Sequence, residues 1–162
     1  MFKLGGVIPA LVTPFTDDGK NIDEERSRRL IRHVMSLGVT GLVPCGTTGE
    51  FQNLSEQERR RVVEIAIDEA KGRIPVIAGT GASGTDLAIE KTTHAKDAGA
   101  DAAIIVTPYF TNPQTGASTN TIEGSRKPSI SRSSYTTSLK RQEYHCPGRL
   151  SRTLSISQTS SD

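Results

Sequence analysis

The sequence predicts a parallel α/β fold over residues 1–114, followed by a disordered tail over residues 115–162. Two observations predict the fold: short runs that are apolar on both faces, and stretches of a dozen or more residues with helical periodicity between them. A third predicts the tail, because 19 of the 48 residues from Thr115 onward are Ser or Thr, and no Val or Phe follows Phe110. Such a segment buries too little apolar surface to offset the entropy of ordering.

Four apolar runs are the predicted strands: GVIPALVTPF (6–15), GLVPC (41–45), PVIAGTG (75–81) and DAAIIV (101–106). Each is bounded by Gly, Pro or Asp, which interrupt regular structure. This pattern is typical of strands buried on both faces of a parallel sheet.

Three helices are predicted between these strands from their capping residues. Asp23 caps the first, which runs to about Ser36 and ends at Gly38. The second opens with a capping box at Ser55 and Glu58 and ends at Gly72. The third runs from a cap at Thr85 through Ala98 to Gly99. The expected inward positions are Leu30, Ile31, Val34 and Met35 in the first helix, and Val62, Val63, Ala66 and Ile67 in the second.

The spacing of strands and helices leaves two architectures open. An open doubly wound sheet could be completed near this chain length. A (β/α)8 barrel needs about 250 residues, so the four strands and three helices present here would form only its first half.

Composition excludes several functional classes. The net charge of +2 indicates no strong attraction to nucleic acid or to an anionic membrane. No apolar stretch reaches the ~18 residues of a membrane helix, and we expect no signal peptide. Cys45 and Cys146 lie in regions of different character, so we expect no disulfide and a cytoplasmic location. We expect no cofactor and no metal, because His33 and His94 lack partners at metal-ligand spacing.

The loop that follows the second strand is the strongest candidate site. Gly46 and Gly49 would let the backbone turn tightly, so that successive N–H groups point at one anion, and Thr47 and Thr48 add hydroxyl donors. This pattern fits a carboxylate or a phosphate. The alternative is an ordinary tight turn whose hydroxyls satisfy local backbone groups, and spacing alone does not choose between the two.

The remaining candidates carry weaker signals. The 79–84 loop lacks both the G-x-G-x-x-G pattern and the P-loop lysine. The aromatic residues at 107–110 are more typical of packing than of catalysis. Cys45 is interpreted as a buried apolar residue rather than a nucleophile. The charged run 56–61 is interpreted as a solvated helix face, and both helical histidines as surface or interface residues.

The first 114 residues resemble the dihydrodipicolinate synthase / N-acetylneuraminate lyase family. The matching pieces are GVIPALVTPF, GVTGLVPCGTTGE, LSEQER, GRIPVIAGTG and GADAAIIVTPYF. The resemblance implies a (β/α)8 barrel in which a lysine late in the barrel forms a Schiff base with pyruvate or another 2-oxo acid. It also implies a homo-oligomer that is a dimer of dimers.

The resemblance assigns roles to individual residues. Thr47 and Thr48 would bind the pyruvate carboxylate beside Gly46 and Gly49, and Thr47 would join a catalytic hydroxyl relay. Tyr109 would line the active-site or dimer-contact region. Phe110 stands where the family relay has a tyrosine from a neighbouring subunit, which weakens the dihydrodipicolinate synthase assignment relative to other lyases of the family.

The family's later motifs are absent after Gln114. These are a strand ending in YNVP with a catalytic tyrosine, an arginine, and then the Schiff-base lysine. We interpret the residues from about Thr115 as a frameshifted translation. Reading the third base of each codon with the first two of the next permits GIYEHYRRIEEAVDIPVILYNVPKKTG from Gly116 onward, without the arginine. Lys140 has no predicted strand to position it and is not assigned the Schiff-base role.

Several functions therefore remain open. The first is a 4-hydroxy-tetrahydrodipicolinate synthase-type lyase that condenses pyruvate with an aldehyde in lysine and diaminopimelate biosynthesis, truncated and inactive in this chain. The alternatives in the same family are a 2-keto-3-deoxy sugar acid aldolase and an N-acetylneuraminate lyase. Two alternatives lie outside the family. One is a non-catalytic anion-binding open α/β module, and the other, ranked last, is a tail that serves as an interaction segment. A half barrel exposes a strand edge, so we predict a molten or aggregating species unless the chain dimerises.

Overall fold

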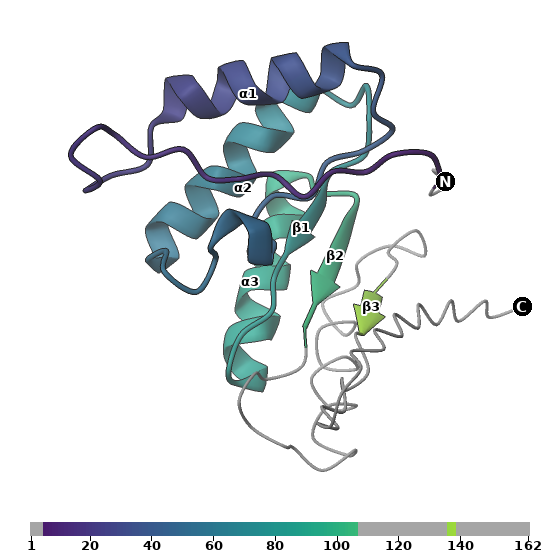
Figure 1. Ribbon diagram of the computed structural model, residues 1–162. Coiled ribbons are helices and arrows are strands. Elements are labelled where there is room, and N and C mark those ends of the chain that lie inside the picture. The colour runs from purple at the N-terminus through teal and green to yellow at the C-terminus, as the bar shows by residue number, and fades with distance from the viewer. Residues whose placement is uncertain (1–4, 107–135, 139–162) are drawn as a thin grey trace, which may run out of the picture.

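The computed structural model describes residues 5–106 and 136–138 (Figure 1). In chain order the elements are α1 (Glu24–Ser36), the 3₁₀ helix η1 (Thr47–Gly49), α2 (Glu56–Ala70), β1 (Ile77–Gly79), α3 (Thr85–Ala98), β2 (Ala102–Ile105) and β3 (Thr136–Ser138). Helices and extended segments alternate along residues 5–106, which confirms the predicted α/β class.

The sheet is parallel and its strands are ordered β1-β2-β3. Ile77 is paired with Ala102 where β1 meets β2, and Ala103 is paired with Thr136 where β2 meets β3. β1 and β2 lie within the predicted third and fourth strands. Neighbours in the sheet are also neighbours in the order of strands along the chain, as in a barrel.

The first two predicted strands are extended segments, here called the 7–13 segment and the 40–45 segment, and they are paired through single bridges. These parallel bridges are Ala10 with Val43 and Leu42 with Val76. Proline explains why neither ladder continues. Pro9 has no N–H to donate to the 40–45 segment, and Pro44 has none to donate to β1.

Within the predicted tail, Thr136–Ser138 form β3 against β2. The outer edge of β2 presents unpaired backbone N–H and C=O groups, and any extended segment can pair with them whatever its side chains. The rest of the tail, with Lys140 and Cys146, lies outside the described residues.

The helix caps follow the predictions at two of the three starts. Asp23 accepts a hydrogen bond from the Arg26 N–H at 2.8 Å. Ser55 and Glu58 form the predicted capping box at the start of α2. The predicted cap at Thr85 is wrong by one residue: Gly84 occupies the N-cap of α3 with extended backbone angles, and Thr85 is the first helical residue.

The helix ends also follow the prediction closely. Gly38 and Gly99 lie in the left-handed region after α1 and α3. After α2 the chain leaves the helix one residue earlier than expected, because Lys71 is left-handed with a φ of 48° before Gly72.

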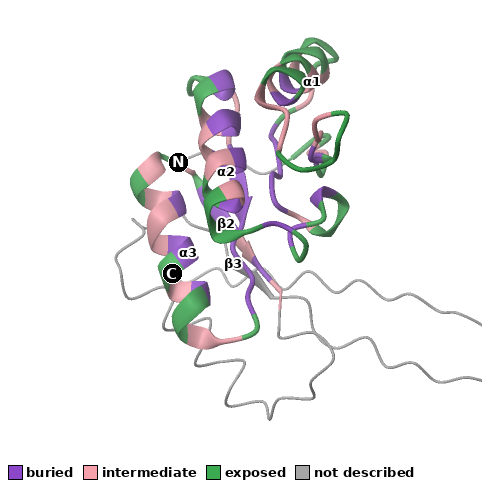
Figure 2. Cartoon of the chain, turned by 90° about the vertical axis from the view of Figure 1, so that its left-hand side faces the viewer, coloured by how far each residue is buried: buried purple, intermediate pink, exposed green. Residues whose placement is uncertain are grey.

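The three helices form one layer over the sheet, and Figure 2 looks onto that layer with their buried stripes turned inward. The largest core cluster joins α1 to α2 and to the first extended segments through Leu11, Ile31, Leu42, Ile65, Ala66, Ala70 and Val76. The predicted inward faces are confirmed, since Ile31, Val62, Val63 and Ala66 are buried and Leu30, Val34, Met35 and Ile67 are half-buried.

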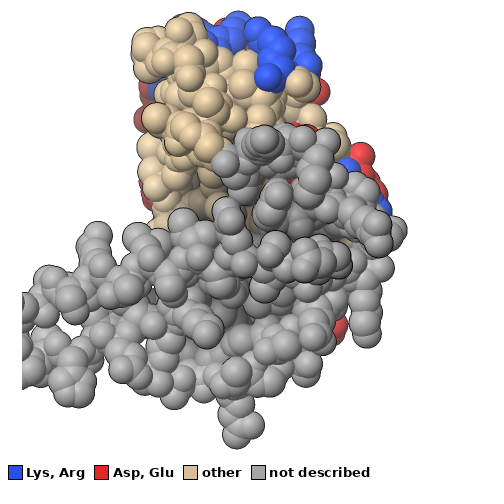
Figure 3. Space-filling view, turned by 90° about the vertical axis from the view of Figure 1, so that its right-hand side faces the viewer, with Lys and Arg blue, Asp and Glu red and all other residues tan. Residues whose placement is uncertain are grey.

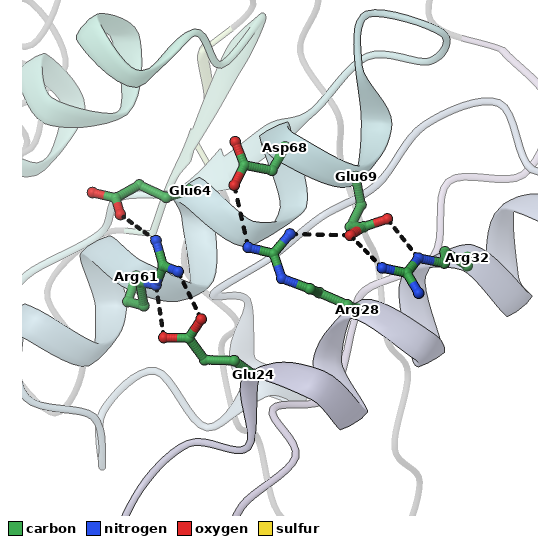
Figure 4. Close-up of polar contacts among 7 residues, drawn as sticks. All are labelled: Glu24, Arg28, Arg32, Arg61, Glu64, Asp68 and Glu69. Carbon is green, nitrogen blue, oxygen red and sulfur yellow. Dashed lines mark hydrogen bonds and ion pairs between the residues drawn. The ribbon is translucent and has the colours of Figure 1, made fainter.

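A network of ion pairs fastens α1 to α2 (Figure 4). Arg32 binds both carboxylate oxygens of Glu69, with two contacts of 2.9 Å, and Arg28 donates to the same carboxylate at 3.0 Å. Arg61 binds Glu24 through two contacts of 2.6 and 2.8 Å. Bidentate pairing of this kind fixes the orientation of the two helices as well as their distance.

No helix within residues 5–106 is both long enough and apolar enough to cross a membrane.

Candidate functional site

The candidate site is the loop at the carboxyl end of the 40–45 segment, which folds into η1. The Thr13 hydroxyl donates to the Gly49 carbonyl at 2.8 Å and fastens the loop to the end of the 7–13 segment. Thr13 and Gly49 are both buried. Because the carboxyl ends of the parallel strands meet at this edge of the sheet, the loop lies where α/β proteins place their ligands.

The turn of this loop is made by residues that the sequence did not indicate. Cys45 and Glu50, on either side of η1, carry the left-handed backbone angles, with φ of 55° and 54°. Gly46 and Gly49 both have negative φ, so the prediction that they supply the conformational freedom for the turn is wrong. Non-glycine residues with positive φ cost free energy, and they concentrate at functional sites.

Glycine is needed in this region for space. A Cβ on Gly49 would lie 2.8 Å from the Leu11 carbonyl oxygen, and one on Gly79 would lie 1.9 Å from the Cys45 carbonyl oxygen. The η1 backbone therefore packs directly on the 7–13 segment, and the end of the 40–45 segment packs directly on β1, without intervening side chains. This close approach holds the left-handed Cys45 in place at the start of the loop.

Thr47 and Thr48 present the donors of the site. Both are exposed. The N–H groups of Gly49 and Glu50 are used inside the turn, where they bind the carbonyls of Gly46 and Thr47 at 3.0 and 3.1 Å. Within the described part of the chain, neither the N–H nor the hydroxyl of Thr47 or Thr48 has a hydrogen-bond partner. Neighbouring donors without acceptors on an exposed turn can bind a carboxylate or a phosphate.

Cys45 does not have the character of a nucleophile. Its side chain is 2% exposed, and its thiol is 3.5 Å from the Arg59 carbonyl oxygen. Burial raises the pKa of the thiol to about 12, with a smaller opposing effect from the Arg59 charge. The thiol is therefore protonated at neutral pH, in agreement with its interpretation as a buried apolar residue.

Arg59 is the residue of the site that sequence reasoning missed. The 56–61 run was interpreted as a solvated face, yet Arg59 is only 8% exposed. Its guanidinium donates to the Gly81 carbonyl at 2.9 Å, lies 3.5 Å from the Gly79 carbonyl, and stacks over the Phe51 ring at 5.0 Å. A planar cation with several donors can satisfy carbonyls and an aromatic face together.

The pattern that could have identified Arg59 is its helical spacing. Arg59, Val62, Val63 and Ala66 follow i, i+3, i+4, i+7, which is one face of α2, and all four are buried. Its neighbour Arg60 fits the prediction of a solvated helix face, since it is exposed and pairs with Glu90.

The 79–84 loop is a packed strand end rather than a phosphate loop. Gly79 and Gly81 supply carbonyls to Arg59, and a Cβ on Gly81 would lie 2.6 Å from the Val106 side chain. The buried Thr80 hydroxyl accepts from the Thr92 hydroxyl at 2.9 Å. These contacts use the Gly79 and Gly81 carbonyls and the Thr80 hydroxyl inside the protein.

The other candidates are placed as follows. Tyr109 and Phe110 lie outside the described residues. His33 is exposed, and His94 is half-buried with its ring nitrogen 3.2 Å from Glu64. No group of three potential metal ligands occurs within residues 5–106 and 136–138.

The geometry defines a parallel α/β protein with strands in sequential order and, at their carboxyl ends, an exposed loop that carries the donors of Thr47 and Thr48. The sequence model of the dihydrodipicolinate synthetase family matches residues 3–120, and the chain belongs to this family.

Individual relatives agree with this assignment. The chain is 53% identical over 112 residues to 4-hydroxy-tetrahydrodipicolinate synthase of Methanopyrus kandleri, a match that covers 69% of this chain and 37% of that protein. It is 52% identical over 113 residues to the synthase of Agrobacterium fabrum, covering 70% and 37%. The chain therefore spans little more than a third of the length of these relatives.

Solved structures show the same likeness. The dihydrodipicolinate synthase of Aquifex aeolicus superimposes with a TM-score of 0.73 at 38% identity, over 77% of this chain and 42% of that one. A prophage protein of the dihydrodipicolinic acid synthase family from E. coli K12, solved in complex with pyruvate, gives a TM-score of 0.72 at 34% identity, over 76% and 41%. These neighbours are TIM barrels, so the described fold corresponds to part of a barrel rather than to a complete open sheet.

Proposed function

We propose that this chain carries the 2-oxo acid carboxylate site of a 4-hydroxy-tetrahydrodipicolinate synthase-type lyase, and that Thr47 and Thr48 bind the carboxylate of pyruvate. The observation that carries the proposal is the pair of exposed threonines whose N–H and hydroxyl groups lack acceptors in the described part of the chain. Family membership supports pyruvate over other anions, because two solved relatives hold it.

The donors of the loop suit a carboxylate that must also be oriented. Two N–H groups and two hydroxyls can bind both oxygens of a carboxylate and so fix the plane of the adjacent carbonyl. In the complete enzyme that carbonyl carbon would be attacked by a lysine to form the Schiff base, before the C–C bond to the aldehyde is made. Thr47 would also pass a proton through its hydroxyl, as the resemblance implies.

The chain alone is proposed to bind pyruvate without forming the Schiff base. Lys91 is the buried lysine of residues 5–106, but it lies on α3 and its ammonium pairs with Glu56 at 2.8 Å. The other described lysines are exposed or lie on helices. The aldehyde partner, the dimer-of-dimers assembly and the roles of Tyr109 and Phe110 remain predictions.

The test is an NMR titration of the full chain with pyruvate. We expect the amide signals of Thr47 and Thr48 to shift and saturate, and Thr47→Val and Thr48→Val to weaken binding by about tenfold each through loss of one charge-assisted hydrogen bond. Thr93→Val is the matched control, because its hydroxyl binds the Ile89 carbonyl within α3. Treatment with borohydride should leave the mass of the chain unchanged.

Two results would refute this proposal. If pyruvate moves no signal in the η1 loop, the exposed threonines form an ordinary turn. If inorganic phosphate binds the loop more tightly than pyruvate and both valine variants weaken it, the site is a general anion module instead.

We also infer that the residues from about Thr115 are read in a shifted frame. The support is the continuous permitted reading GIYEHYRRIEEAVDIPVILYNVPKKTG over residues 116–143. Determining the nucleotide sequence across the codons for Phe110 to Ser118 from an independent template tests it. A gained or lost base there is expected, and an unbroken frame refutes the inference.

A further inference from the structure

The exposed N–H donors of the η1 loop, those of Thr47 and Thr48, take their direction from hydrogen bonds on the other side of their own peptides. A peptide unit is planar and trans, so its C=O and N–H point in opposite directions. The Gly46 carbonyl, which shares a peptide with the Thr47 N–H, accepts from the Gly49 N–H at 3.0 Å. The Thr47 carbonyl, which shares a peptide with the Thr48 N–H, accepts from the Glu50 N–H at 3.1 Å. The two bonds that close η1 therefore also aim these donors.

The peptide between Gly49 and Glu50 is held from outside the loop by Thr13. Its N–H binds the Thr47 carbonyl, and its C=O accepts from the Thr13 hydroxyl at 2.8 Å. Thr13 and Gly49 are both buried, so a carbonyl that lost this donor would lose its hydrogen bond away from water. A series of hydrogen bonds thus runs from the Thr13 hydroxyl through two peptides to the Thr48 N–H.

Glu50 shows why this peptide has to be held. Its φ is 54°, in the left-handed region that is costly for residues other than glycine. Rotating the peptide between Gly49 and Glu50 by about half a turn would bring that φ to a negative value, and it would break both hydrogen bonds of the peptide. Thr13 opposes this rotation. Glycine at position 49 permits the contact, because a Cβ there would lie 3.3 Å from the Thr13 hydroxyl oxygen and 2.8 Å from the Leu11 carbonyl oxygen.

Donor direction matters at this loop because its free donors are neutral. Residues 41–58 contain no Lys or Arg, and the Arg59 guanidinium binds the Gly81 carbonyl. On the face drawn in Figure 3, Lys and Arg gather at the upper margin, away from the carboxyl end of β2, whose arrow points downward in Figure 1. A carboxylate at the loop would therefore depend on aligned N–H and O–H dipoles, which strengthen one another when they are hydrogen-bonded in series.

We propose that Thr13 is a positioning residue of the carboxylate site, which acts on the anion through the two peptides that end at the Thr48 N–H. This inference rests on the proposed function, since it concerns how the same loop binds pyruvate. The Thr13 hydroxyl keeps the peptide between Gly49 and Glu50 in the orientation that closes η1. It also donates into the far end of the series, which makes the Thr48 N–H a stronger donor. The Thr47 N–H belongs to the other peptide and depends less on Thr13.

The experiment repeats the pyruvate titration of the full chain with substitutions at residue 13. Thr13→Val keeps the β-branched shape and removes the hydroxyl, so we expect pyruvate to bind about threefold to tenfold more weakly. Thr13→Ser keeps the donor and should bind within about twofold of the unchanged chain. Thr92→Val is the matched control, because the Thr92 hydroxyl is also buried and binds the Ala88 carbonyl within α3 at 2.7 Å. It lies outside the loop and should leave pyruvate binding within about twofold.

Two signatures separate positioning from a general loss of stability. In Thr13→Val without pyruvate, the amide proton signal of Thr48 should move upfield further than that of Thr47. The Glu50 amide of this variant should exchange with solvent about tenfold faster. In a Thr13→Val background, Glu50→Gly removes the left-handed strain and should restore pyruvate binding, whereas Glu50→Gln removes the same charge, keeps the strain and should not.

If Thr13→Val loses its helical circular dichroism, Thr13→Cys takes its place, because its thiol is only a weak donor. The proposal is overturned if the valine variant binds pyruvate like the unchanged chain, if Thr13→Ser binds as weakly as the valine variant, or if Thr92→Val weakens binding equally. If the unchanged chain does not bind pyruvate, the proposed function fails by itself, and the amide signals of the free chain then judge Thr13. An unchanged Thr48 signal together with unchanged Glu50 exchange in Thr13→Val overturns the positioning role in either case.

Discussion

Replacing Glu69 by Gln is expected to loosen the contact between α1 and α2. The carboxylate is 7% exposed and accepts hydrogen bonds from Arg28 and, through both oxygens, from Arg32. The hydrogen bond from Arg32 is the largest cause of a pKa that is lowered from 4.5 to about 2, against an opposing effect of burial. That difference corresponds to about 3 kcal/mol in favour of the ionised form in the folded state.

The pH dependence has a definite sign. Because the folded-state pKa lies below the unfolded-state value, the stabilisation is fully present above pH 4.5 and is lost as the pH falls towards 2. Glu69→Gln should therefore lower the free energy of unfolding by about 2–3 kcal/mol at pH 7, and the gap from the unchanged chain should close by about pH 2. Urea unfolding followed by circular dichroism at 222 nm, repeated at pH 7, 5, 4, 3 and 2, measures both quantities.

Asp68→Asn is the control for this substitution. Asp68 is the neighbouring residue on α2, its side chain is 58% exposed, and it makes a single 3.3 Å contact with Arg28. An exposed pair of this kind contributes about 0–1 kcal/mol, so the control should change little. Equal losses in the two variants, or a Glu69→Gln loss that persists unchanged at pH 3, would refute the reasoning from the buried carboxylate.

Three further substitutions test the backbone around the η1 loop. Gly79→Ala should destabilise the chain by about 3 kcal/mol or more, because the added Cβ meets the Cys45 carbonyl, whereas Gly5→Ala, with no atom within 4 Å, should change stability by less than about 0.5 kcal/mol in the same urea assay. Arg59→Met leaves two carbonyls without their donor, so it should lower the free energy of unfolding by about 1–3 kcal/mol and broaden the Thr47 and Thr48 amide signals. Arg60 is exposed, and Arg60→Met is the control. Equal broadening of these signals in Arg60→Met would contradict the role given to Arg59. In a Cys146→Ser background Cys45 is the remaining thiol, and burial raises its pKa to about 12. We expect Cys45 to react with a disulfide reagent at pH 8 at least a hundredfold more slowly in the native chain than in denaturant. Equal rates in the two conditions would contradict the burial of Cys45.

Helix boundaries were predictable because their signals are local. Asp23 and the pair Ser55–Glu58 bind N–H groups only a few residues away, and those contacts need no knowledge of the rest of the fold. The cap at Thr85 was misplaced because Gly84 takes the extended N-cap conformation without any side-chain bond that a sequence pattern could show.

Strand pairing was less predictable, because it depends on which N–H faces which neighbour. The apolar runs at 6–15 and 41–45 were correctly placed at the sheet, but the prediction treated them as full strands. Pro9 and Pro44 happen to fall where their N–H would donate to the adjacent strand, so each ladder shrinks to one bridge. Pro9 placed one residue away would face outward and would leave its ladder intact, whereas a proline at residue 43 would remove the N–H that donates to the Pro9 carbonyl. A composition pattern cannot separate these cases.

The candidate site depends both on local sequence signals and on contacts between distant segments, and Arg59 shows why only the local part was predictable. The donors Thr47 and Thr48 were identified from residue type alone. The groups that shape their loop come from α2 and from the end of β1, and these meet only in the folded chain. Gly79 admits the Cys45 carbonyl, and the Arg59 guanidinium binds the carbonyls of the strand end while its own carbonyl lies against the Cys45 thiol. A charged residue on an apolar helix face is therefore better interpreted as a partner for strand-end carbonyls than as a solvated side chain whenever its spacing matches the buried stripe.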